Sequence, residues 1–305
     1  MLAGVPFIPR IDVPLDASHP RVWTIVLTGD GTPRSGRPHR PRGHRPGRWP
    51  HRTAMFASPR AARPLEQASR LAPAGQMITV MTRRWASVWK QELDMLPHGP
   101  CVVQPTYRGR AAELLLPLLK LARRDPAATV IVLPAAHRLE HDARLSRYVG
   151  RAVWAVALRP DVPLIIGAPP ESPEADGWIE PGAPVEGLEG LAVRTVRHFI
   201  DGASPAERRE LFDHHAIAST SILVARADTL LALAGRALPD VLETLEPLED
   251  VFDRPEESLL CEAIYECMPQ VGLRALERAP ELAVLALPDA VWRAPEHDRL
   301  ELLAA

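Results

Sequence analysis

Trp23–Arg34 reads WTIVLTGDGTPR, a short apolar and β-branched run that leads into a glycine-bearing loop ending on an arginine. The run predicts a buried β-strand. Glycine has no Cβ, so such a loop can bring backbone N–H groups close to a phosphate, although ordinary turns use the same residue types. The stretch therefore predicts a strand end that suits an anion, and the rest of the chain must supply the context.

That context is an alternation of strands and helices. Thr129–Pro134 is the clearest strand, because it is a continuous apolar run of the kind that parallel sheets bury on both faces. Further strands are predicted at 77–82, 101–105, 163–166, 191–200, 221–224 and 282–287, with a turn or strand at 177–180. Helices are predicted at 64–71, 84–96, 111–124, 205–213 and 227–237, and one near the C-terminal end. This order predicts an α/β fold with a mainly parallel sheet and helices on both faces. Since no repeat or clear linker interrupts it, we expect a single domain over residues 1–305.

The composition is that of an ordinary globular protein, with 305 residues, 46% apolar and 24% charged. A net charge of −2 gives no global attraction to nucleic acid or to an anionic membrane. Of the 36 basic residues, only Lys90 and Lys120 are lysines, and both fall inside predicted helices. Chemistry that needs an ammonium group at a strand end therefore has no candidate.

The cysteine content and the apolar pattern both bear on the compartment. Cys101, Cys261 and Cys267 are odd in number and lack metal-ligand spacing, which fits a reducing environment better than a disulfide framework. Residues 1–20 lack the basic start and apolar run of a signal peptide, and no stretch approaches the roughly 18 apolar residues of a membrane span. These features predict a cytoplasmic protein without a membrane partner.

Residues 33–52 form a run of Arg, Pro, Gly and His with almost nothing to bury, which predicts a flexible, solvated loop. Its arginines could hold the anionic tail of a nucleotide beside the glycine loop. Binding of RNA is the less favoured interpretation, because only Trp49 is present for base stacking.

Four further segments, in order, resemble one enzyme family. They are Gln104–Ala111 (QPTYRGRA), Thr129–His137 (TVIVLPAAH), Pro173–Gly182 (PEADGWIEPG) and Leu276–Trp292. The chain is similar in these segments to the sugar-phosphate nucleotidyltransferases, and most to the mannose-1-phosphate guanylyltransferases, over nearly its whole length.

The resemblance implies a mixed, Rossmann-like sheet and a reaction that joins a sugar 1-phosphate to a nucleoside triphosphate with release of pyrophosphate. Bound Mg²⁺ would be the cofactor if the protein is active. The implied nucleotide-binding residues are Thr28, Gly29, Asp30, Gly31, Thr32, Arg34, Gln104, Arg108 and Gly109. The implied sugar-side residues are Gly177, Trp178 and Glu180.

The sequence departs from the family pattern at its charged positions. The two aspartates expected to bind the metal fall on Ala136 and Ala294, and alanine offers no ligand to Mg²⁺. One expected lysine falls on Gly202 and another on His51, while Pro33 interrupts the glycine loop. No metal ligand and no firm catalytic residue can be assigned, and Arg34, His51 and Asp201 are the remaining catalytic candidates.

Two function classes follow from these departures. The first is a catalytically impaired relative that binds nucleotide or nucleotide-sugar, or that pairs with an intact nucleotidyltransferase or with its own copy. The second is an active guanylyltransferase in which Arg34, His51, Arg108 and Asp201 supply the charge. A distant alternative is a zinc hydrolase, since His137, Glu140 and His141 match a short His-x-x-Glu-His pattern. The base and the sugar are not specified, because the positions that would choose them are among those changed.

Overall fold

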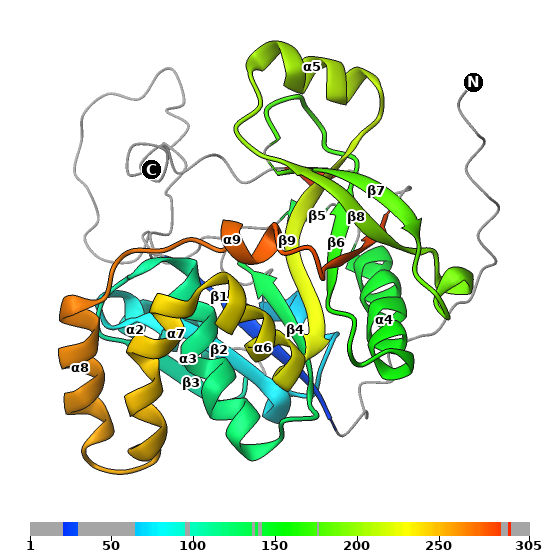
Figure 1. Ribbon diagram of the computed structural model, residues 1–305. Helices are drawn as coiled ribbons and strands as arrows, with labels where there is room; N and C mark the ends of the chain where they lie inside the picture. The colour runs from blue at the N-terminus through cyan, green and yellow to red at the C-terminus, as the bar shows by residue number, and fades with distance from the viewer. Residues whose placement is uncertain are drawn as a thin grey trace, which may run out of the picture.

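The computed structural model describes residues 21–29, 65–94, 98–135, 138–139, 142–175, 177–287 and 292–293 (Figure 1). The strands are β1 (Val22–Leu27), β2 (Met77–Thr82), β3 (Cys101–Gln104), β4 (Thr129–Pro134), β5 (Arg138–Leu139), β6 (Leu164–Ala168), β7 (Trp178–Pro184), β8 (Val193–Ile200), β9 (Ile217–Arg226), β10 (Ala283–Ala286) and β11 (Trp292–Arg293). The α-helices are α2 (Ala86–Leu93), α3 (Gly109–Arg124), α4 (Asp142–Leu158), α5 (Pro205–Asp213), α6 (Ala227–Ala237), α7 (Pro239–Leu245), α8 (Glu257–Cys267) and α9 (Arg274–Glu277). Short 3₁₀ turns lie at η1 (Ala74–Gln76), η2 (Arg83–Trp85), η3 (Glu189–Leu191) and η4 (Glu246–Asp250).

The main sheet is mixed, with the strand order β3-β2-β1-β4-β9-β6-β10-β8-β7. The pairings β3–β2, β2–β1, β1–β4 and β6–β10 are parallel. The other pairings, β4–β9, β6–β9, β10–β8, β7–β8 and β7–β9, are antiparallel. The sheet is mixed, as predicted, but parallel pairing predominates only from β3 to β4, and beyond β4 only the β6–β10 pair of the described strands is parallel. Strand direction depends on long-range pairing, and the apolar run of a single strand does not record it.

Strand β9 joins the two halves of the sheet. It pairs with β4 and β6, and its first residues also pair with β7, where Ile217 lies opposite Ile179 and Ala218 opposite Trp178. The ring β9-β6-β10-β8-β7 therefore closes on itself, as a small barrel does. The open, Rossmann-like layout holds for the first half of the chain only.

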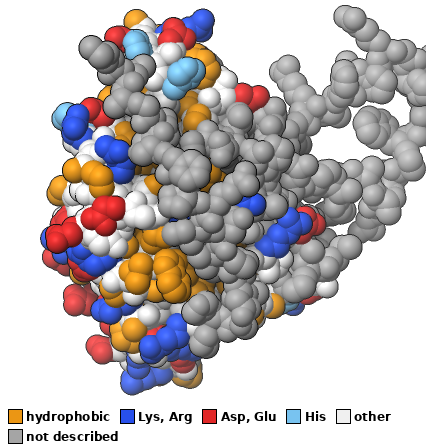
Figure 2. Space-filling model, turned by 90° about the vertical axis from the view of Figure 1, so that its right-hand side faces the viewer, with side chains coloured by type: hydrophobic (Ala, Val, Ile, Leu, Met, Phe, Trp, Pro, Cys, Tyr) orange, Lys and Arg blue, Asp and Glu red, His pale blue; other side chains and the backbone are white. Residues whose placement is uncertain are grey.

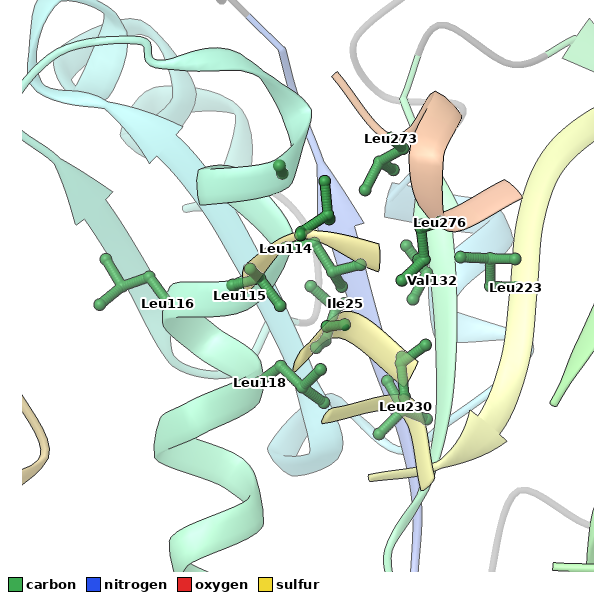
Figure 3. Close-up of a cluster of buried hydrophobic side chains, with 14 of the residues drawn as sticks. Ile25, Leu114, Leu115, Leu116, Leu118, Val132, Leu223, Leu230, Leu273 and Leu276 are labelled. Atoms are coloured by element: carbon green, nitrogen blue, oxygen red, sulfur yellow. The ribbon is translucent and has the colours of Figure 1, made fainter. Parts of the chain in front are cut away.

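Helices cover both faces of the sheet, as predicted. In β1, Ile25 and Leu27 point into a cluster shared with α3 and α6, and Figure 3 shows Ile25 among the leucines of α3. Val22 and Val26 point to the opposite face, into a second cluster shared with α4. This alternation follows from the two-residue period of a strand. Both clusters are fully closed from solvent around β1 and β4.

Local patterns placed several elements well. The bounds of β2, β4, α5 and α6 match their predicted ranges, and α3 continues through Pro117. Helix α4 was not predicted, although its buried positions recur at helical spacing. The loop 33–52 and the C-terminal helix lie outside the described residues. None of the helices described is long and apolar enough to cross a membrane.

Candidate functional site

The carboxyl ends of β1, β2, β3 and β4 lie together at one edge of the sheet, because these strands are parallel. Antiparallel β9 brings its early residues, Ser219 to Ser221, to the same edge, next to the end of β4. Ligands of open α/β sheets bind outside the carboxyl ends of the strands. This edge, with α9 above it in Figure 1, is the candidate site.

At the end of β1, the backbone N–H of Gly29 donates a hydrogen bond to Oε1 of Glu113 over 2.7 Å. Glu113 lies in the second turn of α3 and is 1% exposed. A carboxylate of the chain itself therefore accepts the loop N–H, where an anion-binding loop would turn that group to a phosphate. Burial raises the pKa of the nearby Tyr265 phenol, and the charges of Cys261 and Glu113 raise it further, so that Tyr265 stays neutral.

The loop between β3 and α3 is also occupied by contacts within the chain. Arg108 donates from Nε to the carbonyl of Tyr265 at 2.6 Å and from Nη2 to that of Glu266 at 3.0 Å. Val271 donates to the Arg108 carbonyl and accepts from the N–H of Ala111, both at 3.1 Å. These contacts hold the predicted nucleotide residues Arg108 and Gly109 against the segment after α8. Of the other predicted nucleotide residues, Gln104 is buried at the end of β3 and Thr28 directly follows β1.

The predicted sugar-side segment forms the start of β7. Trp178 is 1% exposed, and its Nε1 donates to the carbonyl of Ala175 at 3.1 Å, so its ring belongs to the core. Gly177 adopts φ +70°, and a Cβ there would lie 2.3 Å from Nη1 of Arg274. The glycine therefore gives this guanidinium room to approach the backbone.

Glu180 lies in β7, opposite His198 of β8, and its side chain is 44% exposed. It forms an ion pair with Nη1 of Arg197 at 3.0 Å. Its other carboxylate oxygen lies 2.8 Å from Nδ1 of His198, and this contact is an ion pair when the imidazole is protonated. The hydrogen bond to His198 is the main cause of its lowered pKa, and Arg197 contributes. Glu180 is therefore an ionised, paired carboxylate.

Asp201 follows β8 and is compensated by two arginines. It forms an ion pair with Arg278 and lies 3.8 Å from Nε of Arg274, and its side chain is 16% exposed. Gly202, where the family would place a lysine, follows it with φ +65°. The catalytic candidate Asp201 thus faces positive charge supplied by the residues of α9 and its C-cap.

Glu277 is a site residue that the sequence reasoning missed. It is 2% exposed, accepts from Arg274 Nη1 at 2.9 Å, and lies 3.4 Å from the donating Oγ of Ser219. Leu273 and Leu276 anchor α9 in the core, and Figure 3 shows them beside strands β4 and β9. A glutamate in a short helix ordinarily faces solvent, so no local pattern singles out Glu277.

The Mg²⁺ that the resemblance implies finds no ligand group among the residues that the structure describes. Within the described ranges no three His, Cys, Asp or Glu side chains come together as a metal group. Asp201 and Glu277, the two carboxylates beside α9, are both ion-paired with Arg274. Ala136 and Ala294 lie outside the described residues, as do Asp30, Gly31, Thr32, Arg34 and His51.

The zinc-hydrolase alternative loses its structural premise. The pattern needs a helix, because two ligating histidines must lie one turn apart on the same face. Arg138 and Leu139, which lie inside the pattern, form strand β5 and pair with β11. His137, Glu140 and His141 are outside the described residues.

The face shown in Figure 2 carries interspersed acidic and basic side chains, with no large area of one sign among the residues described.

No protein-family model and no curated protein matches this sequence. The architecture is similar to that of the sugar-phosphate nucleotidyltransferases, as expected. A crystal structure described as mannose-1-phosphate geranyltransferase from Thermus thermophilus has a TM-score of 0.68 at 20% identity, over 89% of this chain and 75% of that one. Another, described as mannose-6-phosphate isomerase from Helicobacter pylori, has a TM-score of 0.63 at 12% identity, over 89% and 99%. At these identities the likeness concerns the fold.

Proposed function

We propose that this protein is a catalytically impaired relative of the sugar-phosphate nucleotidyltransferases, of the mannose-1-phosphate guanylyltransferase type, which binds a nucleotide or nucleotide-sugar in the cytoplasm. The observation that carries the proposal is the hydrogen bond from the Gly29 N–H to the buried Glu113 carboxylate. It places a buried carboxyl group and a satisfied donor at the strand end where the reaction needs positive charge and open donors.

The reaction class explains why this substitution matters. Attack of one phosphate on another requires cations to offset their repulsion. Here the expected metal ligands are alanines in the sequence, and the expected lysine position is Gly202. Arg108 is engaged with the carbonyls at the end of α8. Several losses in one site are harder to compensate than one, so turnover should be very slow.

The same geometry favours a nucleotide-sugar over a nucleoside triphosphate. A nucleotide-sugar carries less negative charge, because its diphosphate is esterified at both ends. The buried Glu113 therefore disfavours it less. The opposite side of the edge offers an aromatic ring, Phe199, and the guanidinium of Arg274, with ring centroid and Cζ 5.8 Å apart.

The second candidate is an active guanylyltransferase with a rebuilt site. Of the four residues it needs, Arg108 and Asp201 are described, and both are engaged with other groups of the chain. A regulatory role beside an intact nucleotidyltransferase, or in a homo-oligomer, is the outcome that we would adopt if no nucleotide binds.

A thermal-shift titration with GTP and with GDP-mannose, each with and without Mg²⁺, tests the proposal. Binding at a hundredfold excess over Kd adds about 2.7 kcal/mol of apparent stability. We expect a shift with GDP-mannose, a smaller one with GTP, and no release of pyrophosphate from GTP and mannose 1-phosphate. Release of pyrophosphate at an ordinary enzymatic rate would contradict the proposal, and no shift with either nucleotide would leave the regulatory role.

A further inference from the structure

Arg274 lies between two carboxylates that come from different parts of the chain. Its Nη1 is 2.9 Å from Oε2 of Glu277 on α9, and its Nε is 3.8 Å from Oδ1 of Asp201 after β8. Ser219 of β9 supplies a hydroxyl to the other oxygen of Glu277. One guanidinium thus connects the segment after β8 with α9, and Glu277 extends the contact to β9.

The buried carboxylate requires such a cation. The side chain of Glu277 is 3% exposed, and an ionised carboxylate at that depth is stable only when it is paired and hydrogen-bonded. Asp201, with 16% of its side chain exposed, is compensated by Arg278 as well as by Arg274. Of the two arginines, only Arg274 has ion-pair contacts to both carboxylates.

The surroundings hold Arg274 in one place. Its backbone belongs to α9, which Leu273 and Leu276 anchor in the core (Figure 3). The ring of Phe199 lies beside the guanidinium, and Gly177 leaves the space that its Nη1 fills. The position is therefore fixed from the helix side, the strand side and the side of the β7 segment.

We infer that Arg274 is the built-in cation of this site, held between Asp201 and Glu277 as a divalent metal would be held by two carboxylates. The protein would then bind a phosphate-bearing ligand without Mg²⁺. A guanidinium remains protonated at every physiological pH and matches phosphate oxygens in geometry. The identity of the ligand rests on the proposed function, whereas the role of Arg274 toward the two carboxylates does not.

Removal of the guanidinium should convert the place into a metal site. We would titrate Mn²⁺ into wild-type protein and into Arg274→Ala at pH 7, and measure free Mn²⁺ by electron paramagnetic resonance. We expect Arg274→Ala to bind Mn²⁺ about tenfold or more tightly than wild type does, equivalent to about 1.4 kcal/mol. Added Mn²⁺ should also raise the melting temperature of the variant and leave that of the wild type unchanged.

Two matched variants assign the effect to this pair of carboxylates. Arg278→Ala removes the other arginine beside Asp201 but keeps Arg274, so it should not gain Mn²⁺ binding. Arg274→Ala combined with Glu277→Gln should lose the gain, because an amide is a poor replacement for a carboxylate ligand. Arg274→Lys keeps a cation and should behave as the wild type does toward Mn²⁺.

The inference is overturned if the wild type binds Mn²⁺ as tightly as Arg274→Ala, or if Glu277→Gln leaves the gain unchanged. If Arg274→Ala folds poorly without metal, Mn²⁺ should restore its folding. Arg274→Gln also removes the guanidinium, and its failure to gain Mn²⁺ binding would overturn the inference as well. These measurements involve no nucleotide. A negative result here therefore leaves the thermal-shift test of nucleotide binding untouched.

Discussion

The candidate site lies at the edge of the sheet where β1 to β4 end, and its two sides satisfy their polar groups in opposite ways. On the nucleotide side, formed by β1 to β4 and α3, the groups that could bind an anion are closed by backbone or carboxylate partners, as Gly29 is by Glu113. On the sugar side, formed by β7, β8 and α9, arginines meet carboxylates and stay partly exposed. The side chain of Arg274 is 39% exposed and that of Arg278 is 54% exposed.

The difference separates a side whose described donors are engaged within the chain from a side that keeps partly exposed charged groups. A buried hydrogen bond to a carboxylate fixes the nucleotide side as it stands. A guanidinium that is held in place but 39% exposed, as that of Arg274 is, still presents part of its donor surface to a ligand. We therefore expect substitutions on the nucleotide side to change stability most, and ligand binding to respond to charge.

The largest expected loss of stability comes from a substitution in the loop between β3 and α3, on the nucleotide side. Gly109 has φ +85°, and a Cβ there would lie 2.1 Å from the carbonyl oxygen of Val271. Gly187 has a similar φ of +80° with no atom within 4 Å of an added Cβ. Gly187→Ala should cost roughly 1–2 kcal/mol, and Gly109→Ala roughly 4 kcal/mol or more, by urea denaturation. Equal losses would mean that the contact with Val271 does not constrain the loop.

The next largest loss of stability is expected from a substitution that weakens the packing of α9, which connects the two sides. Leu276 is 0% exposed in the core below α9, so Leu276→Ala should lower the free energy of unfolding by about 2–5 kcal/mol. Leu259 on α8 is 75% exposed, and Leu259→Ala should change it by no more than about 0.5 kcal/mol. Chemical denaturation of both variants measures the difference. A small loss for Leu276→Ala would show that α9 is not anchored as Figure 3 suggests.

A subtler substitution sharpens the comparison through charge alone. Glu113→Gln keeps an oxygen for the Gly29 N–H and removes the ionisable carboxyl group, and with it any negative charge that it carries. We expect GTP to bind about tenfold more tightly, or about 1.4 kcal/mol, measured by calorimetry. Glu257→Gln removes a charge that is paired with Lys120 elsewhere on the same half, and it should leave GTP affinity unchanged. An equal response of both variants would assign the effect to net charge.

The smallest expected effect concerns the reactivity of the thiol of Cys261, which lies on α8. Burial, followed by the charge of Glu257, raises the pKa of Cys261 to about 11. Its reactive thiolate is therefore scarce near pH 8 and increases as the pH rises toward that value. Cys101 and Cys267 are exposed. A thiol-labelling assay should modify two cysteines in the native protein and the third only on unfolding, and rapid labelling of all three would contradict this burial.

The sequence predicted the elements whose signals are local. The apolar run of β4, Pro205 at the start of α5 and the helical period of α6 are each signals of neighbouring residues, so those elements appear at the expected positions. The cap of α5 is a reciprocal pair of hydrogen bonds between Ser204 and Glu207. The extent of a single domain over residues 1–305 stays a prediction.

By itself, the sequence determined the α/β class and the likeness to nucleotidyltransferases, while the loss of lysine and aspartate from the expected positions stays a prediction. Only the tertiary structure decided how the remaining charges are used. Glu113 meets a backbone N–H 84 residues away, and Arg278 meets Asp201 across 77 residues. The closure of β9 onto β7 is likewise a pairing between distant segments. Such contacts depend on where the chain folds back, and no local period or spacing contains that information.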